Sequence, residues 1–345
     1  MQLKSQIGGD TLLQTPQQGR SARRGKAVPV TSARLAHDLA WHEGRHPLES
    51  WQFSTSLRGG DHHFSFRIHL LIVEPSAKEP QISIGLCLLD QDTGWIREVE
   101  NTVPLKDILI SGQALQISSR EVDISGSGTD IHIVADLPDA SIELTGTISS
   151  PVLVNNGEGV FYFLGAQHYK FSLPAIQVSG SVDIMGKPQS VTGAMWLNRQ
   201  WGALPRRFSL DRNLEQRQWI NLYPQLSNGI KISASQLWDF SCNRIETCCT
   251  VVLPDGTHII EKIEPLDLND FVDSRLSGRR YPRHVVLSHE PLETCLQISL
   301  PSQHREVVSK IGNLIKFDGK IVVDGYIYGE EVTGEGFVEM VGRWR

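Results

Sequence analysis

From Glu49 onward, apolar and polar residues alternate with a period of two over most of the chain. One such run places Phe64, Phe66, Ile68 and Leu70 at every second position, with Ser65, Arg67 and His69 between them. Similar runs cover residues 82–88, 131–136 and 142–144. This alternation is typical of antiparallel strands that turn one face to a core and the other to water. The sequence therefore predicts an all-β protein.

Turn-forming segments rich in Gly, Asp, Asn and Pro separate these runs. They lie at residues 58–61, 90–92, 125–128, 155–157, 185–188 and 254–256. Many short strands with few helices indicate antiparallel barrels or sandwiches, and a closed barrel encloses an interior that suits a lipophilic ligand. The sequence predicts at most two helices. One is a short helix over Ser32–Trp41, and the other is the segment Pro265–Leu276, which is equally compatible with a loop.

Composition excludes several classes of protein. Hydrophobic residues make up 40% and charged residues 21% of the 345 residues, which is typical of folded globular chains. The net charge is −6, and the nearest basic cluster, at residues 20–26, lies in a Gly/Gln/Ser-rich start that we expect to be flexible, so nucleic-acid binding is not expected. The first residues carry no apolar leader and no run is long enough to span a membrane, which predicts a cytoplasmic protein.

No metal or cofactor motif is present. The five cysteines show no metal-ligand spacing, and neighbouring residues such as Cys248 and Cys249 point to opposite faces of a strand. His62 and His63 point apart for the same reason, and His42 and His46 lack a helical metal-binding context. Phosphate-binding loops, dinucleotide fingerprints and the serine-hydrolase elbow are also missing. We therefore expect a site without metal or cofactor.

The stretch from Trp196 to Trp201 is the strongest candidate for chemistry. In a strand, Trp196, Asn198 and Gln200 share one face, while Trp201 lies on the other. Two amides beside an indole form a neutral hydrogen-bonding wall that can hold a carbonyl. The alternative is that both Trp side chains belong to the core and the amides bridge loops.

Three further residues are candidates with a structural alternative each. Glu49 shares a strand face with Trp51, and burial beside an indole would raise its pKa and make it a general acid, unless an Arg pairs with it. Tyr162 follows a Gly-rich turn and points away from its two Phe neighbours. Tyr281 could orient a polar group of a ligand, although buried Tyr hydroxyls usually have a structural partner.

Several segments, in order, resemble one known family. They are residues 49–53, 63–66, 157–163, 191–202, 280–283 and 334–342, of which the Trp-x-x-x-x-Trp-Gly stretch ending at Gly202 is the most specific. In these segments the chain resembles the carotenoid hydratase-like (AttH-like) lipocalin family, which also includes natural-product Diels–Alder cyclases. The likeness begins near residue 42 and runs to the end of the chain.

The resemblance implies two lipocalin-like antiparallel β-barrel or sandwich domains, with a ligand in or between them. We place a flexible segment at 1–40, an N-terminal domain at 41–185 and a C-terminal domain at 186–345. Two positions depart from the family pattern. Asn198 stands where Asp is usual, which removes a proton donor, and Ser50 stands where a second aromatic residue is usual, which leaves room beside Trp51.

The first functional hypothesis is a cofactor-independent cyclase, similar to a Diels–Alderase, that acts on a lipophilic polyene or polyketide intermediate. A pericyclic step needs no proton transfer, in agreement with Asn at position 198. The predicted catalytic residues are Asn198, Gln200, Glu49 and Tyr162. The residues expected to wall the substrate are Trp51, Phe53, Phe66, Trp196, Trp201 and Tyr281.

Two alternatives stay open. A hydratase that adds water to an alkene of an isoprenoid-like substrate needs a strong acid, for which Glu49 or Glu339 would serve, although Glu339 could simply face solvent. A non-enzymatic carrier of a lipophilic ligand would use the same apolar interior. All three hypotheses make a lipophilic small molecule the partner, and the oligomeric state is left open.

Overall fold

Two large antiparallel sheets make up the molecule, which is described here by a computed structural model. The structure describes residues 27–28, 35–73, 79–163, 165–204, 215–300, 306–308, 314–342 and 344. Within these ranges strands dominate, and the one α-helix is α1 (Leu35–Leu39). No helix in the described part is long and apolar enough to cross a membrane. The prediction of an all-β, lipocalin-like fold with few helices is confirmed.

The first sheet has 13 strands in the order β5-β4-β3-β2-β14-β13-β10-β9-β8-β7-β6, with β11 and β12 paired to β13. Its strands are β2 (Leu48–Gly59), β3 (His62–Val73), β4 (Gln81–Asp90), β5 (Ile96–Pro104), β6 (Leu109–Ile110), β7 (Gln116–Ser118), β8 (Val122–Ser127), β9 (Asp130–Leu137), β10 (Ala140–Ile148), β11 (Leu153–Val154), β12 (Val160–Phe163), β13 (Ala166–Ile184) and β14 (Lys187–Gly202). A short 3₁₀ turn, η2 (Leu105–Asp107), follows β5.

The second sheet has 11 strands in the order β1-β18-β17-β16-β15-β24-β23-β21-β20-β19, with β22 paired to β23. Its strands are β1 (Ala27–Val28), β15 (Arg217–Leu226), β16 (Lys231–Asp239), β17 (Arg244–Val252), β18 (His258–Glu261), β19 (Asp267–Asp273), β20 (Arg280–His289), β21 (Thr294–Ser299), β22 (Glu306–Val308), β23 (Ile315–Ile327) and β24 (Glu330–Gly342). The 3₁₀ turn η3 (Glu290–Leu292) precedes β21. The segment at Pro265–Leu276, expected as helix or loop, is mainly strand β19.

The sheets divide later in the sequence than expected. Residues 187–202 form β14, which pairs with β13 and β2 inside the first sheet, so the predicted boundary after residue 185 cuts a hairpin. The turn at Met185-Gly186, where both residues have positive φ, is a tight reversal rather than a linker. In the sequence, the last strand of the first sheet ends at Gly202, and β15 of the second sheet begins at Arg217. In the segment 1–40, expected to be flexible, the described part contains β1 and α1, and the rest lies outside the described residues.

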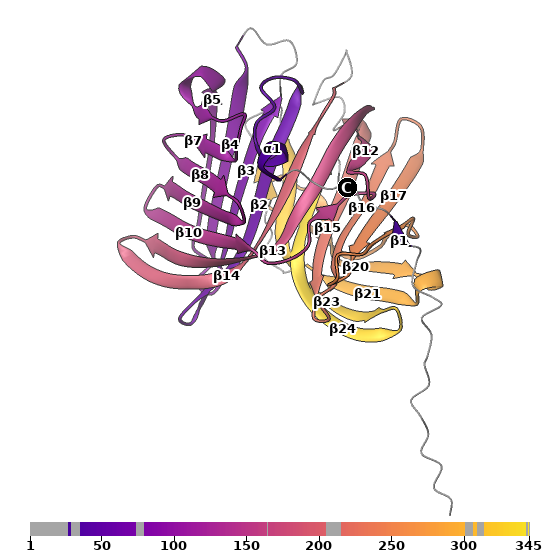
Figure 1. Cartoon of the computed structure of the whole chain (residues 1–345). Coiled ribbons are helices and arrows are strands. Elements are labelled where there is room, and N and C mark those ends of the chain that lie inside the picture. Colours follow the sequence, from indigo (N-terminus) through magenta and orange to yellow (C-terminus); the bar gives the residue numbers. More distant parts are fainter. Residues whose placement is uncertain are drawn as a thin grey trace, which may run out of the picture.

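Each sheet curls around its own core, and Figure 1 shows the two curled sheets side by side. One core contains Trp51, Phe53, Phe66 and neighbouring aliphatic residues of β2 to β14. The other contains Tyr281, Phe317 and aliphatic residues of β15 to β24. Small hydrophobic clusters join the sheets. One is formed by Leu153, Trp196, Tyr223, Val252 and Phe337, and in another Phe163 of the first sheet packs against Trp219 and Val341 of the second. The rest of the junction carries many polar side chains.

Glycines let the longest strands lie close to their neighbours where the sheets curl. A Cβ at Gly193 of β14 would lie 2.0 Å from the Ser56 carbonyl oxygen of β2. A Cβ at Gly336 of β24 would lie 2.1 Å from the Tyr223 carbonyl oxygen of β15. Strand β13 also bends, because its pairing with β14 shifts register between Leu173 and Ile176. These features bring the strands that flank the junction together.

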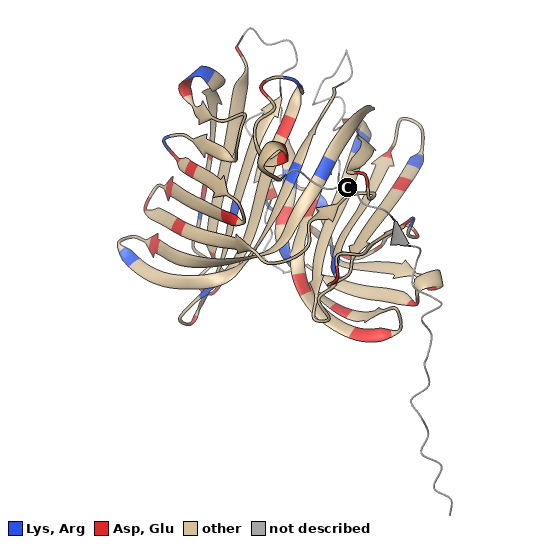
Figure 2. Ribbon diagram, in the orientation of Figure 1, with Lys and Arg blue, Asp and Glu red and all other residues tan. Residues whose placement is uncertain are grey.

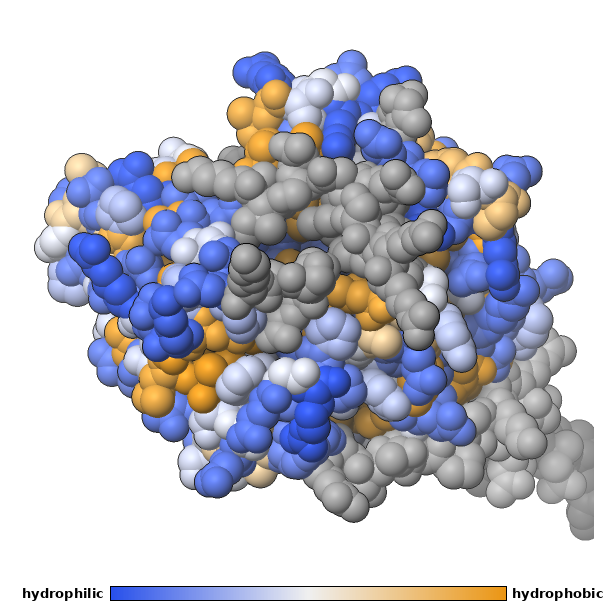
Figure 3. All heavy atoms as spheres, turned by 90° about the horizontal axis from the view of Figure 1, so that it is seen from above, coloured by the Kyte–Doolittle hydropathy of each residue, from blue (hydrophilic) through white to orange (hydrophobic). Residues whose placement is uncertain are grey.

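The surface carries both signs of charge. Figure 2 shows Lys and Arg scattered among Asp and Glu over both sheets. On the face seen in Figure 3, hydrophobic residues form separate patches among hydrophilic ones.

Candidate functional site

A cavity of about 460 Å³ lies between the two sheets. The first sheet and the chain next to its strands contribute Leu48, Ser50, Gln52, His69, Leu71, Val73, Asn155, Asn156, Glu158, Val160, Phe161, Tyr162, Phe163, Lys170, Asn198 and Gln200. The second sheet and Leu314 beside it contribute Trp219, Asn221, Tyr223, Ser235, Gln236, Leu237, Glu246, Thr247, Cys248, Leu314, Lys316, Glu339 and Val341. The site is therefore assembled between the halves rather than inside one of them.

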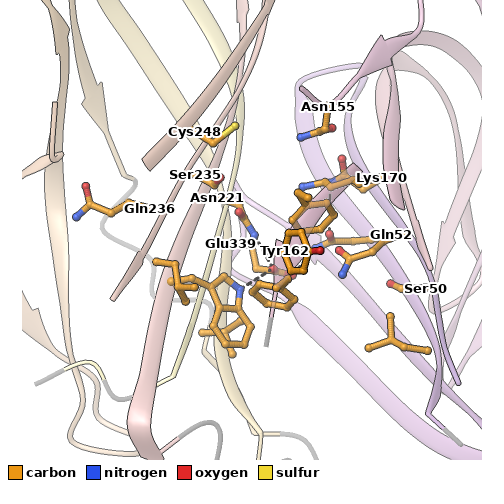
Figure 4. A pocket seen from close by; sticks show the side chains of 18 of the residues that line it. Ser50, Gln52, Asn155, Tyr162, Lys170, Asn221, Ser235, Gln236, Cys248 and Glu339 are labelled. Atoms are coloured by element: carbon orange, nitrogen blue, oxygen red, sulfur yellow. Dashed lines mark hydrogen bonds between the residues drawn. The ribbon is translucent and has the colours of Figure 1, made fainter. Parts of the chain in front are cut away.

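Glu339 of β24 holds together the polar wall of the cavity (Figure 4). Its Oε1 accepts hydrogen bonds from Asn221 Nδ2 at 3.1 Å and from Trp219 Nε1 at 3.4 Å. Its Oε2 accepts one from Gln52 Nε2 of the first sheet at 3.0 Å. Glu339, for which the sequence leaves open a role as an acid or a position facing solvent, lines the cavity.

Two hydrogen-bond donors fix the orientation of the Asn198 side-chain amide. Its Oδ1 accepts from Ser172 Oγ and from Trp196 Nε1, each at 2.7 Å. Since an indole N–H can only donate, the acceptor atom must face Trp196. The amide nitrogen then donates to Gln52 Oε1 at 3.4 Å. Gln200 also lines the cavity, so both predicted amides face it, but the Trp196 indole lies buried behind Asn198 and is not part of the wall; the role of the amides in catalysis stays a prediction.

Lys170 and Tyr223 form a polar pair that we did not predict. Lys170 Nζ donates to the Tyr223 hydroxyl at 3.0 Å, and the ammonium lies 4.9 Å from the centre of that ring. The Lys170 side chain is only 7% exposed, and burial lowers its pKa to about 8. Burial, together with the charges of Glu339 and Asp318, raises the pKa of Tyr223 well above its usual range. At neutral pH the pair presents an ammonium and an un-ionised hydroxyl.

His69 lies between the main cavity and a second one of about 210 Å³, since it lines both together with Leu71, Leu314 and Lys316. Lys316 Nζ lies 2.9 Å from His69 Nδ1, and Ser50 Oγ lies 3.1 Å from Nε2. Because an ammonium only donates, Nδ1 accepts and Nε2 carries the ring proton. Burial, with Lys316 and Arg67 nearby, lowers the pKa of His69 well below its ordinary value, so the ring is neutral.

Aromatic residues make the wall on the β12 side. Phe161, Tyr162 and Phe163 all line the cavity, and Phe163 packs edge-to-face on Trp219 with ring centres 5.0 Å apart. Tyr162 is 73% exposed and so lies at the rim. The cavity thus combines an aromatic surface with amides, the two lysines Lys170 and Lys316, and three carboxylates.

Glu49 lies on the opposite face of β2, away from the cavity. It is fully buried and pairs with Arg199 and His42, whose Nδ1 is 3.0 Å from Oε2. Burial alone would raise the pKa of Glu49, but the hydrogen bonds and charges of His42 and Arg199 outweigh it and lower the pKa. The predicted raised pKa is therefore wrong, and the structural alternative, an Arg partner, is what the structure contains.

The aromatic residues expected to wall the substrate do not line the cavity. Trp51, Phe53 and Phe66 lie in the first core, and Trp196 is buried behind Asn198. Trp201 stacks on Tyr169 with ring centres 5.5 Å apart. Tyr281 lies in the second core and donates to Glu306 at 2.7 Å. The reason is general: the aromatic faces of the strands fill the cores, and the polar faces, expected to be wet, meet the other sheet.

The described residues contain two groups of His and Asp whose ligand atoms lie within 4.8 Å of one another. One is His37, Asp38 and His42; the other is His62, Asp90 and Asp92. His62 and Asp90 already pair at 2.9 Å, and none of the six residues lines the cavity. The cavity is lined by carboxylate, imidazole and thiol groups too, but no three of them in the described part of the chain meet that distance criterion.

Fold and site together define a class of protein in which two curled β-sheets enclose a cavity at their junction. The sequence pattern of the AttH-like family matches residues 26–343, and the chain belongs to this family. At the level of sequence, no curated protein matches.

Three solved structures share the fold. A putative AttH protein from Nitrosomonas europaea has a TM-score of 0.78 at 17% identity, with 92% of this chain and 99% of that one covered. Kievitone hydratase from Nectria haematococca has a TM-score of 0.74 at 16% identity, with 93% and 98% covered. CghA, solved with Sch210972, has a TM-score of 0.61 at 12% identity, with 91% and 94% covered.

Proposed function

We propose that this protein is an enzyme that binds an elongated lipophilic molecule at the junction of its sheets and accelerates its cyclisation without a cofactor. The observation that carries the proposal is that two unlike walls, one of amides and one of aromatic rings, line the same cavity. One wall holds Asn198 and Gln200 on β14, and the other holds the aromatic residues of β12 with Trp219. A flexible polyene that carries a carbonyl matches both walls.

Two physical effects would accelerate such a reaction. Holding diene and dienophile close together removes an entropic barrier worth about 7–11 kcal/mol in the best intramolecular cases. A donor aimed at the carbonyl stabilises charge that develops in the transition state. The amides suit this task because the contacts of Asn198 with Trp196 and Gln52 fix its orientation before the substrate arrives.

Hydration of an alkene is the second candidate, favoured by the carboxyl of Glu339 in the cavity. The fold of a kievitone hydratase is similar, which agrees with this candidate but does not select it. Protonation of carbon needs a strong acid. Both oxygens of Glu339 instead accept hydrogen bonds, from Gln52 on one side and Asn221 on the other, so we rank cyclisation first. A carrier of the same ligand class is the third candidate.

The test is product analysis with two probes. The first is a synthetic linear trienone with a diene and an enone in one chain; the second is a prenylated phenol incubated in water labelled with heavy oxygen. A cyclase returns a cyclic isomer of unchanged mass from the trienone, with one stereoisomer in excess. A hydratase adds one labelled water to the prenyl group. A carrier binds the probes and returns them unchanged.

Two variants test whether the product is formed at this site. Gln200→Leu removes a donor from the cavity wall and should lower kcat for cyclisation on the order of a hundredfold. Thr192→Val, at an exposed position of the same strand, should leave the rate unchanged. A rate that is equal in both variants would exclude the β14 wall as the catalytic surface.

A further inference from the structure

Lys170 differs from the other buried cations of the described residues in its partners. Arg199 pairs with Glu49, and Lys316 lies 3.0 Å from Asp318 Oδ2. No carboxylate of the described residues lies within 4.0 Å of Lys170 Nζ, whose hydrogen-bond partner is the Tyr223 hydroxyl. Burying an ammonium without an anion is costly, and a nearby anion offsets much of that cost.

The space in front of this ammonium belongs to the cavity. Lys170, Tyr223 and Asn155 all line it. Asn155 lies next to Lys170 in Figure 4, and its backbone N–H donates to the Lys170 carbonyl at 3.3 Å. Asn155 is 8% exposed, its Oδ1 has no hydrogen-bond partner, and its Nδ2 contacts Ser233 Oγ at 3.2 Å. Because a hydroxyl donates as well as accepts, a half-turn of the amide satisfies Oδ1 at Ser233 and places the NH₂ group, a donor, at the position that now lacks a partner.

The nearby acidic groups leave room for an anion. Glu339 is the charge that acts most strongly on Lys170, but its oxygens are held by Gln52, Asn221 and Trp219. Cys248 faces Lys170 as an un-ionised thiol, because burial raises its pKa to about 11. Glu158 and Glu246 line the same cavity. None of these carboxylates lies within ion-pair distance of Lys170 Nζ.

We propose that Lys170, Tyr223 and Asn155 form a subsite for an ionised oxygen acid, a carboxylate or the enolate of a β-dicarbonyl, at the head of a lipophilic chain. The ammonium supplies the charge, and the Tyr hydroxyl and the amide supply further donors. The apolar tail then lies along Leu48, Leu71, Val73 and the aromatic residues of β12. The subsite deepens the proposed function, on which it rests for the use of this cavity, by naming the acidic class of the substrate.

The experiment is a fluorescence titration with parinaric acid, a conjugated polyene carboxylic acid, and with its methyl ester. The wild-type protein should bind the acid at least about tenfold more tightly than the ester, a difference of about 1.4 kcal/mol. Lys170→Met should remove this preference, and Lys170→Arg should keep most of it. Lys187→Met, at an exposed hairpin position, serves as the control and should behave as wild type.

Three outcomes would overturn the subsite: equal affinity of the wild type for acid and ester, a preference that survives in Lys170→Met, or no binding of the acid. Circular dichroism of each variant checks that the fold is retained. The trienone of the cyclisation assay has no acidic group, so the two tests are separate. Trienone turnover without a Lys170-dependent preference for the acid would keep the cyclase and overturn the subsite, whereas Lys170-dependent acid binding keeps the subsite whether or not a trienone without an acidic group reacts.

Discussion

Buried cations in this molecule are stabilised in different ways. The Arg199 guanidinium lies 4.0 Å from the ring centre of Trp51 and pairs with Glu49. It also donates hydrogen bonds to the Asp38 and Ala40 carbonyls. Burial still lowers the pKa of Arg199 to about 10. Lys170 has a hydroxyl and a ring in place of a carboxylate. Arg199 therefore strengthens the fold around α1, whereas Lys170 keeps an unneutralised charge at the cavity.

Lys170→Met should stabilise the ligand-free protein at neutral pH. The folded pKa is about 8 and the ordinary value is 10.5, so the unfolded chain binds more protons between these values and wild-type stability rises with pH there. Below pH 8 the wild type carries the full cost, which the variant avoids, and the expected gain is at most about 3 kcal/mol. Urea unfolding should show the gain at pH 7 and its loss near pH 10.5, with Lys187→Met unchanged at both.

Glu49→Gln should destabilise the protein by about 3–5 kcal/mol, because it leaves Arg199 buried without its anion. Since the pKa of Glu49 is lowered in the folded state, its contribution is present above the ordinary value of 4.5 and is lost as pH falls through the folded value. Wild-type stability should therefore fall more steeply than that of the variant below pH 4.5. Glu79→Gln, in an exposed pair with Lys106, should change stability by less than about 1 kcal/mol; equal losses in both would contradict the argument.

At the scale of elements, the close contact of long strands depends on single glycines. At Gly193 an added Cβ meets the Ser56 carbonyl oxygen, which cannot move without displacing β2 from β14. Gly336 has the same relation to β15 in the second sheet. In both sheets, therefore, a strand that flanks the junction lies too close to its neighbour to allow a Cβ atom at this glycine.

Gly193→Ala should lower the free energy of unfolding by about 3 kcal/mol, as overpacking against backbone does. The check is chemical denaturation of the variant beside Thr192→Ala, an exposed neighbour on β14 that should stay close to wild type. A Gly193→Ala protein of wild-type stability would mean that β14 and β2 are free to separate there.

The strands were predictable because their alternation is local. The run from Phe64 to Leu70 forms part of β3, and the helix expected at Ser32–Trp41 corresponds, in its described part, to α1. The cavity was only partly predictable. Local pattern identified Asn198 and Gln200, but Lys170 and Tyr223 are brought together by sheet packing across 53 positions of sequence. A polar strand face that meets another sheet has the same pattern as one that meets water.

The whole molecule has two cores and a polar junction between them. Besides the contacts of Glu339, Arg67 of β3 pairs with Asp318 of β23, and Val154 N donates to His258 Nε2 at 3.0 Å. Asn155 and Asn156 bond to Ser233 and Thr250 of the second sheet. The association of the halves therefore depends largely on hydrogen bonds and ion pairs.

Asp318→Asn should weaken that association, because it leaves Arg67 and Lys316 without the carboxylate they share. With separate cores, the two sheets should then unfold in two resolved calorimetric transitions, where the wild type shows one. Asp324→Asn, an exposed position further along β23, is the control. A single transition at the wild-type temperature in Asp318→Asn would show that the junction is held by other contacts.

The location of the cavity between two self-sufficient cores also bears on evolution. Most of its lining residues belong to neither core, so replacing one costs little of the packing that keeps each sheet folded. Lining residues can therefore be replaced while the two sheets keep their fold. This agrees with the three similar structures, which have TM-scores of 0.61–0.78 at only 12–17% sequence identity. Folding therefore constrains the residues that line the junction less than those that fill the two cores.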